Sequence, residues 1–107
     1  MSQDTNRLLM ELERSMRAIN REIINPAIQE LTIAGMHPVL RLVAHARARY
    51  IRALFDLGGS ARHGSLNESQ FEELAKLRRE YEELATAAKA LETAIQRGYL
   101  DVRPNGC

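Results

Sequence analysis

The chain has 107 residues, so we expect one domain that buries a moderate core. Its formal net charge is +1, which gives no overall bias toward nucleic acid or a membrane surface. The single cysteine, Cys107, excludes an internal disulfide framework, and no apolar run approaches the ~20 residues of a membrane-spanning helix. The N-terminus is polar and lacks the apolar core of a signal peptide, so we expect a cytoplasmic protein without a membrane partner.

Composition and periodicity predict an all-α fold. Aromatic residues make up 5% of the chain and Trp is absent, so the core must be built from Leu, Ile, Ala and Met, which suits packing of helix on helix. We predict a three-helix up-down-up bundle that forms a single helical domain over residues 1–107. Its outer helices are long and amphipathic, and we expect it to dimerise through coiled-coil-like packing.

The first helix is predicted over residues 5 to 34, with Asp4 or Thr5 as its cap. Apolar residues recur along its first part at steps of three and four, which is the spacing of one helix face. These residues are Leu9, Leu12, Met16, Ile19 and Ile23. Charged residues fill most other positions, so the pattern indicates an amphipathic helix with a mixed-charge outer face.

Asn25 and Pro26 interrupt this pattern, because proline lacks an N–H and disfavours helical geometry at the residue before it. Two outcomes are open. The helix continues with a kink, or Asn25 caps a new short helix with Pro26 in its first turn. We expect the kinked or restarted helix to end near Ala34, with Gly35 as its C-cap.

The second helix is predicted over residues 38–57, with Pro38 in its first turn. Its expected core face is broad and consists of Val39, Leu42, Val43, Ala46, Tyr50, Leu54 and Leu57, widened by Leu40 and Ile51. A broad face suggests burial against two neighbouring helices. Residues 58–65 contain three glycines and two serines, which predicts a flexible loop.

The second helix also carries a basic face, because no acid occurs between Glu30 and Asp56. At 100° per residue its members fall within an arc of about 120° opposite the core face. We define the basic face as His37, Arg41, His45, Arg49 and Arg52. It is either a site for phosphate, nucleic acid or an acidic partner, or a solvated face whose arginines pair with the glutamates of the third helix. We favour the solvated face.

The histidines do not predict a metal site. No two of His37, His45 and His63 have the three- or four-residue spacing of a helical metal pair, and no acid lies among them. Serine and cysteine also lack a nearby arrangement of histidine and acid for nucleophilic catalysis. We therefore predict no metal, no cofactor and no catalytic residue.

The third helix is predicted over residues 67–97 and has the most regular pattern in the chain. Asn67 and Gln70 have the spacing of a capping box, and Gly98 is a suitable C-cap. Its apolar stripe consists of Leu74, Leu77, Tyr81, Leu84, Leu91 and Ile95, with Ala88. Residues 98–107 should form an irregular tail that packs on the bundle through Tyr99, Leu100 and Val102.

These patterns lead to three functional hypotheses. The first is a non-enzymatic protein–protein interaction or adaptor protein that binds itself as a homodimer, or binds another helical protein, with the stripes of the first and third helices as core and interface. The second is a phosphate or nucleic-acid binder that uses Arg41, Arg49 and Arg52. The third is a small helical enzyme with a pocket between helices, for which Tyr81 is the one polar candidate at a core position.

Overall fold

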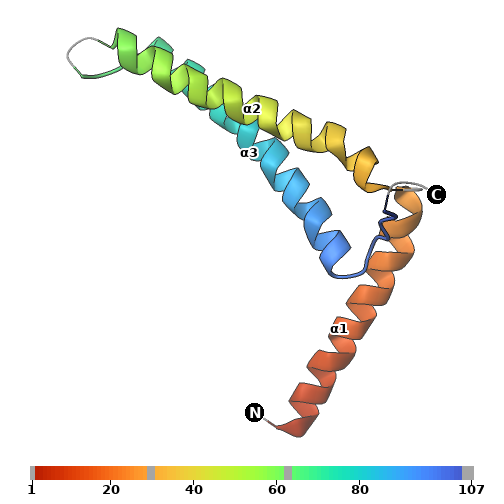
Figure 1. The fold of residues 1–107 in the computed structure, drawn as a ribbon. Helices are drawn as coiled ribbons and strands as arrows, with labels where there is room; N and C mark the ends of the chain where they lie inside the picture. The colour runs from red at the N-terminus through yellow and green to blue at the C-terminus, as the bar shows by residue number, and fades with distance from the viewer. Residues whose placement is uncertain (1, 29–30, 62–63, 105–107) are drawn as a thin grey trace. The chain divides into compact units, whose positions relative to one another are not determined.

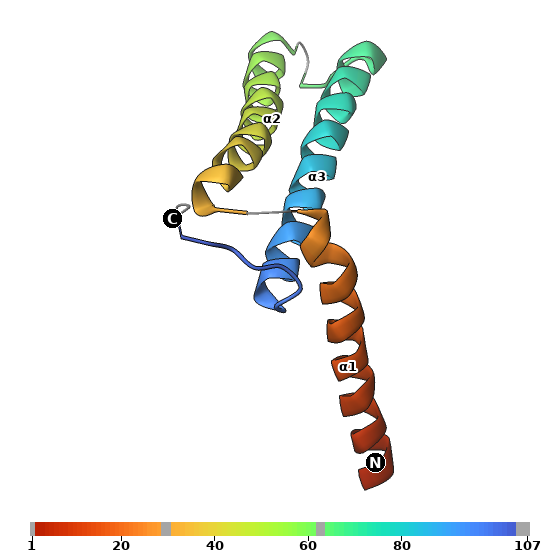
Figure 2. The same ribbon diagram turned by 90° about the vertical axis from the view of Figure 1, so that its right-hand side faces the viewer.

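The computed structural model describes residues 2–28, 31–61 and 64–104 (Figure 1). These ranges contain the α helices α1 (Gln3–Ile24), α2 (Ile33–Ser60) and α3 (Glu68–Gln96), the short 3-10 helix η1 (Asn25–Ala27), and no strand. Helices α2 and α3 pack against each other, and both views show them side by side (Figures 1 and 2). The all-α prediction is therefore confirmed, whereas coiled-coil dimerisation stays a prediction.

The chain forms two compact units. Unit 1 contains Met1–Met36 and Ala90–Cys107, and unit 2 contains His37–Lys89. Unit 1 combines α1 with the last turns of α3 and the segment that follows. Unit 2 is an antiparallel helical hairpin made from most of α2 and α3. That the whole chain acts as one domain stays a prediction.

Helix α1 begins earlier than predicted, because Ser2 caps it in place of Asp4 or Thr5. The Ser2 hydroxyl oxygen accepts a hydrogen bond from the backbone N–H of Thr5 at 3.1 Å. This bond satisfies one of the N–H groups that the first turn of a helix leaves without a partner. Helix α1 contains no buried residue.

The break at Pro26 splits the chain into separate helices. α1 ends at Ile24, η1 follows, and α2 begins at Ile33. The predicted first helix to Ala34 with a C-cap at Gly35 is therefore wrong. The reason is a cap that the sequence pattern did not reveal: the Thr32 hydroxyl accepts a hydrogen bond from the backbone N–H of Gly35 at 2.9 Å, so this glycine lies in the first turn of a new helix.

Helix α2 is longer at both ends than the predicted span of 38–57. Pro38 lies inside the helix, not at its start, and Gly58 and Gly59 are still helical. Pro38 is the sixth residue of α2, so it removes only one backbone hydrogen bond, near the N-terminal end of the helix. Each glycine costs only about 1 kcal/mol relative to alanine, so neither kind of residue breaks the helix. The predicted loop at 58–65 begins after Ser60, and Arg62 and His63 lie outside the described residues.

Helix α3 is bounded by the predicted signals. The Gln70 N–H donates to Asn67 Oδ1 at 2.8 Å, and the Asn67 N–H donates to Gln70 Oε1 at 3.0 Å, which is a reciprocal capping box. At the other end Gly98 has a φ of +74°. The N–H of Tyr99 bonds the carbonyl of Ala94 at 2.8 Å, and the N–H of Gly98 bonds that of Ile95 at 3.1 Å, which completes a Schellman motif.

Unit 2 has a narrow core at the seam between its two helices. Ala46 is 1% exposed, and Tyr50 stacks on Tyr81 with ring centroids 6.2 Å apart. Val43, Tyr50 and Leu57 are half-buried. The remaining members of the predicted core face, Val39, Leu42 and Leu54, are exposed, so the broad core face is wrong. Within unit 2, α3 is the one helix that packs on α2, and a two-helix seam covers only a narrow stripe.

Unit 1 has its core where the segment after α3 folds back. Leu100 is 2% exposed and Ala94 is 7% exposed. The backbone N–H of Arg103 donates to the carbonyl of Leu31 at 2.9 Å, and the N–H of Ile33 donates to the carbonyl of Arg103 at 3.3 Å. The tail is therefore irregular, as predicted, and its described part is anchored by backbone bonds and by burial of Leu100. Cys107 lies outside the described residues.

Candidate functional site

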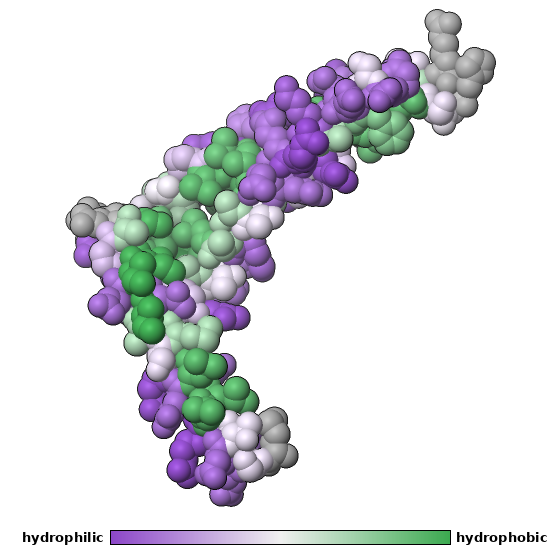
Figure 3. Space-filling view, turned by 180° about the vertical axis from the view of Figure 1, so that it is seen from behind, coloured by the Kyte–Doolittle hydropathy of each residue, from purple (hydrophilic) through white to green (hydrophobic). Residues whose placement is uncertain are grey.

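The apolar residues of α1 form an uncovered surface, which we call the α1 face. Its five members are between 45% and 66% exposed: Leu9 49%, Leu12 53%, Met16 45%, Ile19 54% and Ile23 66%. Figure 3 shows hydrophobic side chains at the surface of this helix among hydrophilic ones. Because every member of the predicted first-helix stripe is exposed, this helix presents a continuous apolar strip that an additional partner can cover.

The stripe on α3 has a different environment. Its predicted members are all half-buried: Leu74, Leu77, Tyr81, Leu84, Leu91 and Ile95. Tyr81 belongs to the seam with α2, where its hydroxyl accepts a hydrogen bond from Arg47 Nε at 3.1 Å and the Arg47 guanidinium lies 5.2 Å from its ring centroid. Tyr81 therefore has a structural partner. Packing of the α3 stripe against the α1 face stays a prediction.

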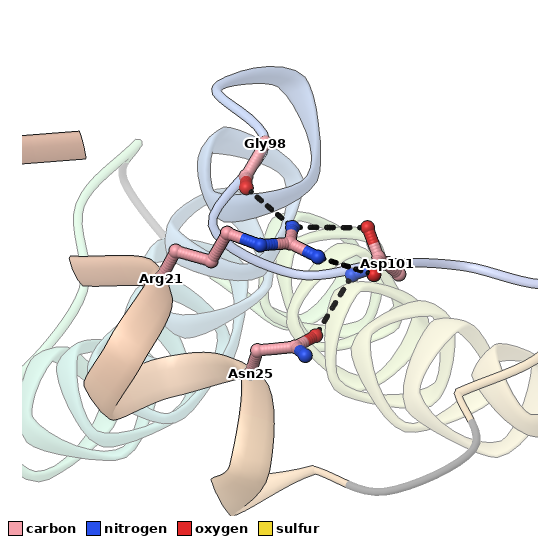
Figure 4. Close-up of polar contacts among 4 residues, drawn as sticks. All are labelled: Arg21, Asn25, Gly98 and Asp101. Atoms are coloured by element: carbon pink, nitrogen blue, oxygen red, sulfur yellow. Dashed lines mark hydrogen bonds and ion pairs between the residues drawn. The ribbon is translucent and has the colours of Figure 1, made fainter. Parts of the chain in front are cut away.

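A polar cluster fixes the C-terminal end of α1 (Figure 4). Arg21 Nη1 donates to Asp101 Oδ1 at 3.0 Å, and Nη2 donates to Oδ2 at 2.6 Å, which is a two-bond fork. Arg21 Nη1 also donates to the carbonyl of Gly98 at 2.9 Å. The Asp101 N–H donates to Asn25 Oδ1 at 3.2 Å. One arginine thus joins α1 to both the end of α3 and the following segment.

The same cluster changes the acidity of both partners. The hydrogen bond and the charge of Asp101 raise the pKa of Arg21 above its ordinary value. The hydrogen bond from Arg21 lowers the pKa of Asp101, and the positive charge of Arg21 acts in the same direction. Both side chains are accessible to water, with 45% and 67% of their surface exposed. Solvent therefore screens this ion pair, and its main effect is to fix geometry.

Sequence reasoning missed this cluster. Arg21 is one of several charged residues on the outer face of α1, and Asp101 lies in an irregular segment. Helical spacing relates residues three or four apart and says nothing about two residues 80 positions apart. The only available signal was the good C-cap at Gly98, which turns the chain back after α3.

The basic face of α2 is exposed along its whole length, since His37, Arg41, His45, Arg49 and Arg52 all belong to the exposed class. Two of its arginines have acidic partners: Arg49 pairs with Glu80 of α3, and Arg52 pairs with Asp56 at 3.2 Å. These pairs agree with the solvated-face interpretation and reduce the free positive charge. Binding of phosphate or nucleic acid at this face stays a prediction.

Beside the basic face lies an open groove of about 850 Å³. It is lined by His45, Ala48, Arg49, Ile51, Arg52, Ala53, Phe55, Asp56 and Leu77. Phe55 is 74% exposed, the highest value among the large apolar side chains. Ile51 was expected at the edge of the core and Phe55 had no predicted role, because a single aromatic residue outside the repeating pattern carries no periodic signal.

Metal sites and membrane-spanning helices were the two other features considered for the residues that the structure describes. No group of three or more His, Cys, Asp or Glu side chains there has the arrangement of a metal site. None of the helices in residues 2–28, 31–61 and 64–104 combines the length and the apolar composition that a membrane crossing requires.

Comparisons with known proteins leave the family of this chain open. No protein-family model matches it, and neither a curated protein nor a solved structure matches it significantly. Functional inference therefore depends on the surfaces and contacts of this molecule.

Proposed function

We propose that this chain is a helical protein–protein interaction protein that forms a homodimer through the α1 face. The observation that supports this proposal is the exposure of Leu9, Leu12, Met16, Ile19 and Ile23, which lies between 45% and 66%. Single exposed apolar residues are common on soluble proteins, but a continuous strip of them marks an interaction surface.

The shape of the α1 face suits another helix. Its five residues alternate by three and four positions and so occupy the core positions of a heptad repeat. At 100° per residue they span an arc of about 80°. Over 22 residues the helix is about 33 Å long. A strip this narrow and straight matches the seam of a two-helix interface, in which each apolar side chain enters a hole between four residues of the partner.

The charge of α1 favours a second copy over an acidic or basic partner. Its four acidic residues, Asp4, Glu11, Glu13 and Glu22, balance four basic ones, Arg7, Arg14, Arg17 and Arg21. A helix without net charge gives no electrostatic preference for a strongly charged partner. In a parallel dimer in register, each g position of one helix lies next to the following e position of the other. These pairs are Leu8 with Glu13 and Ser15 with Asn20 of the second copy. No like charges meet in either contact.

The polar cluster prepares α1 for association. Arg21 and Asn25 hold the C-terminal end of α1 on the segment around Asp101, and Ser2 caps the other end. A helix that is already formed and anchored loses less conformational entropy on binding than a flexible segment does. The α1 face is therefore presented on a helix that is formed and anchored before association.

Sedimentation equilibrium of the full chain over a wide concentration range tests this proposal, with native mass spectrometry of protein purified from its own host as the second measurement. We expect a reversible monomer–dimer equilibrium and a dimer mass. A chain that stays monomeric at high micromolar concentration contradicts the proposal. A stable complex with a different polypeptide and no homodimer would assign the α1 face to another helical protein and would also contradict it.

A further inference from the structure

Two arginines from opposite ends of the sequence line one hollow in unit 1. This hollow has a volume of about 250 Å³ and is lined by Glu13, Met16, Arg17, Arg97 and Tyr99. Arg17 belongs to α1, whereas Arg97 follows the last residue of α3. We call this feature the Arg17–Arg97 hollow. The side chains of its lining residues carry two guanidinium groups, one carboxylate, one phenol and one thioether.

The polar cluster fixes the position of this hollow. Arg21 lies one helical turn beyond Arg17 and holds the carbonyl of Gly98 at 2.9 Å. Arg97 and Tyr99 are the two neighbours of Gly98, so the same contact holds them beside α1. The Schellman motif at the end of α3 fixes the backbone of these residues a second time. The backbone positions of Arg17, Arg97 and Tyr99 are therefore set by the fold.

Neither arginine has an acidic partner among the residues that the structure describes. None of the described residues forms an ion pair with Arg17 or Arg97, in contrast to Arg21, Arg49, Arg52 and Arg78. Glu13 lines the same hollow without pairing with either of them. The hollow therefore keeps a formal charge of +1. Two guanidinium groups around one small space attract an anion, since planar forks of N–H donors match carboxylate and phosphate oxygens.

We propose that the Arg17–Arg97 hollow binds a small organic anion. One carboxylate or phosphate group of the ligand lies between the guanidinium groups of Arg17 and Arg97, and a short apolar part lies against Met16. Met16 is 45% exposed, so it offers apolar contact area. Glu13 disfavours a ligand with several negative charges, and the small volume excludes a nucleic-acid strand. This proposal does not depend on the homodimer.

Nuclear magnetic resonance of the full chain at pH 7 tests the site, with benzoate and phenyl phosphate as probes and sodium chloride at equal ionic strength as reference. We expect at least one probe to cause saturable shifts of the amides of Arg97, Gly98 and Tyr99. Arg17→Gln and Arg97→Gln should each raise its Kd by about tenfold or more, since each removes a charge-assisted fork. Comparison of the two probes shows whether the ligand group is carboxylate or phosphate.

Arg14→Gln is the matched control, because Arg14 is an exposed arginine of the same helix that does not line the hollow. Its Kd should equal that of the unmodified chain. The absence of saturable shifts with both probes overturns the proposal, and so does an equal loss of affinity in Arg14→Gln and Arg17→Gln. Circular dichroism verifies that each variant keeps its helicity, and all three substituted side chains are exposed.

Discussion

Replacing Ile19 by Asp is the sharpest test of the α1 face. Ile19 lies within the apolar strip and is 54% exposed in the single chain. The single chain covers less than half of this side chain, so the substitution should lower the stability of the monomer only in part and leave it folded. In the proposed homodimer it places a carboxylate from each copy into the seam, where water cannot solvate it fully.

The structure sets the size of the effect. Complete burial of an isoleucine side chain contributes roughly 1.5–3 kcal/mol. About half of the Ile19 surface is still exposed, so each copy gains roughly 0.8–1.6 kcal/mol on dimerisation. Two copies lose roughly 1.6–3.2 kcal/mol, which weakens the dimer by about 15- to 200-fold. Desolvation of the two carboxylates adds to this loss.

Sedimentation equilibrium measures the dimer Kd of both proteins, and thermal unfolding at low concentration verifies the monomer. Ala18→Asp is the matched control, because Ala18 is exposed and lies about 100° away from Ile19 on the far side of the helix. We expect Ala18→Asp to keep the original Kd within about twofold. An unchanged Kd in Ile19→Asp refutes the assignment of this strip to the dimer interface.

Three further predictions concern the contacts that shape the two units. The lowered pKa of Asp101 contributes stability that is present above its ordinary pKa of about 3.9 and is lost as the pH falls through the folded value. The melting temperature of Asp101→Asn should therefore lie below that of the unmodified chain at pH 7, and the difference should shrink as the pH falls below about 4. Asn67→Ala removes a capping bond and should lower the free energy of unfolding, measured with urea, by about 0.5–2 kcal/mol. Gly98→Ala forces a side chain into a φ of +74° and should cost about 1–2 kcal/mol in the same assay, although open space surrounds the glycine.

Both ends of α3 were predicted from short sequence motifs, because the contacts that fix them lie within one or two helical turns. The capping box at Asn67 and Gln70 and the C-cap at Gly98 form as expected, because each needs only residues within one or two turns. Gly35 and Pro38 led to wrong predictions of where the first helix ends and where the second begins. Both residues disfavour the interior of a helix. Thr32 nevertheless caps α2 upstream of both, so the helix begins at Ile33 and includes Gly35 and Pro38.

The candidate surfaces were predicted less completely, because they depend on contacts between distant parts of the chain. The periodicity gave the members of the α1 face, but only the structure shows that each one is exposed. The members of the basic face are exposed, yet the pairing of Arg49 with Glu80 depends on the register of α2 against α3, which the sequence does not give. Arg97 had no assigned role and Tyr99 was expected only to pack the tail on the bundle, since their place beside Arg17 depends on the Arg21 contact with Gly98.

The two proposed sites meet at Met16, which belongs to the α1 face and also lines the Arg17–Arg97 hollow. Arg17 lies about 120° from the centre of the apolar strip, so its charge faces away from a second copy, and the two sites share the Met16 side chain. A ligand whose apolar part covers Met16 competes with the second copy for this side chain, so binding of the anion should weaken the dimer, and dimerisation should weaken anion binding by the same factor. Sedimentation equilibrium with and without phenyl phosphate, at constant ionic strength, measures this coupling. A dimer Kd that phenyl phosphate leaves unchanged or lowers would mean that the ligand and the second copy do not compete for Met16, and it would contradict this coupling.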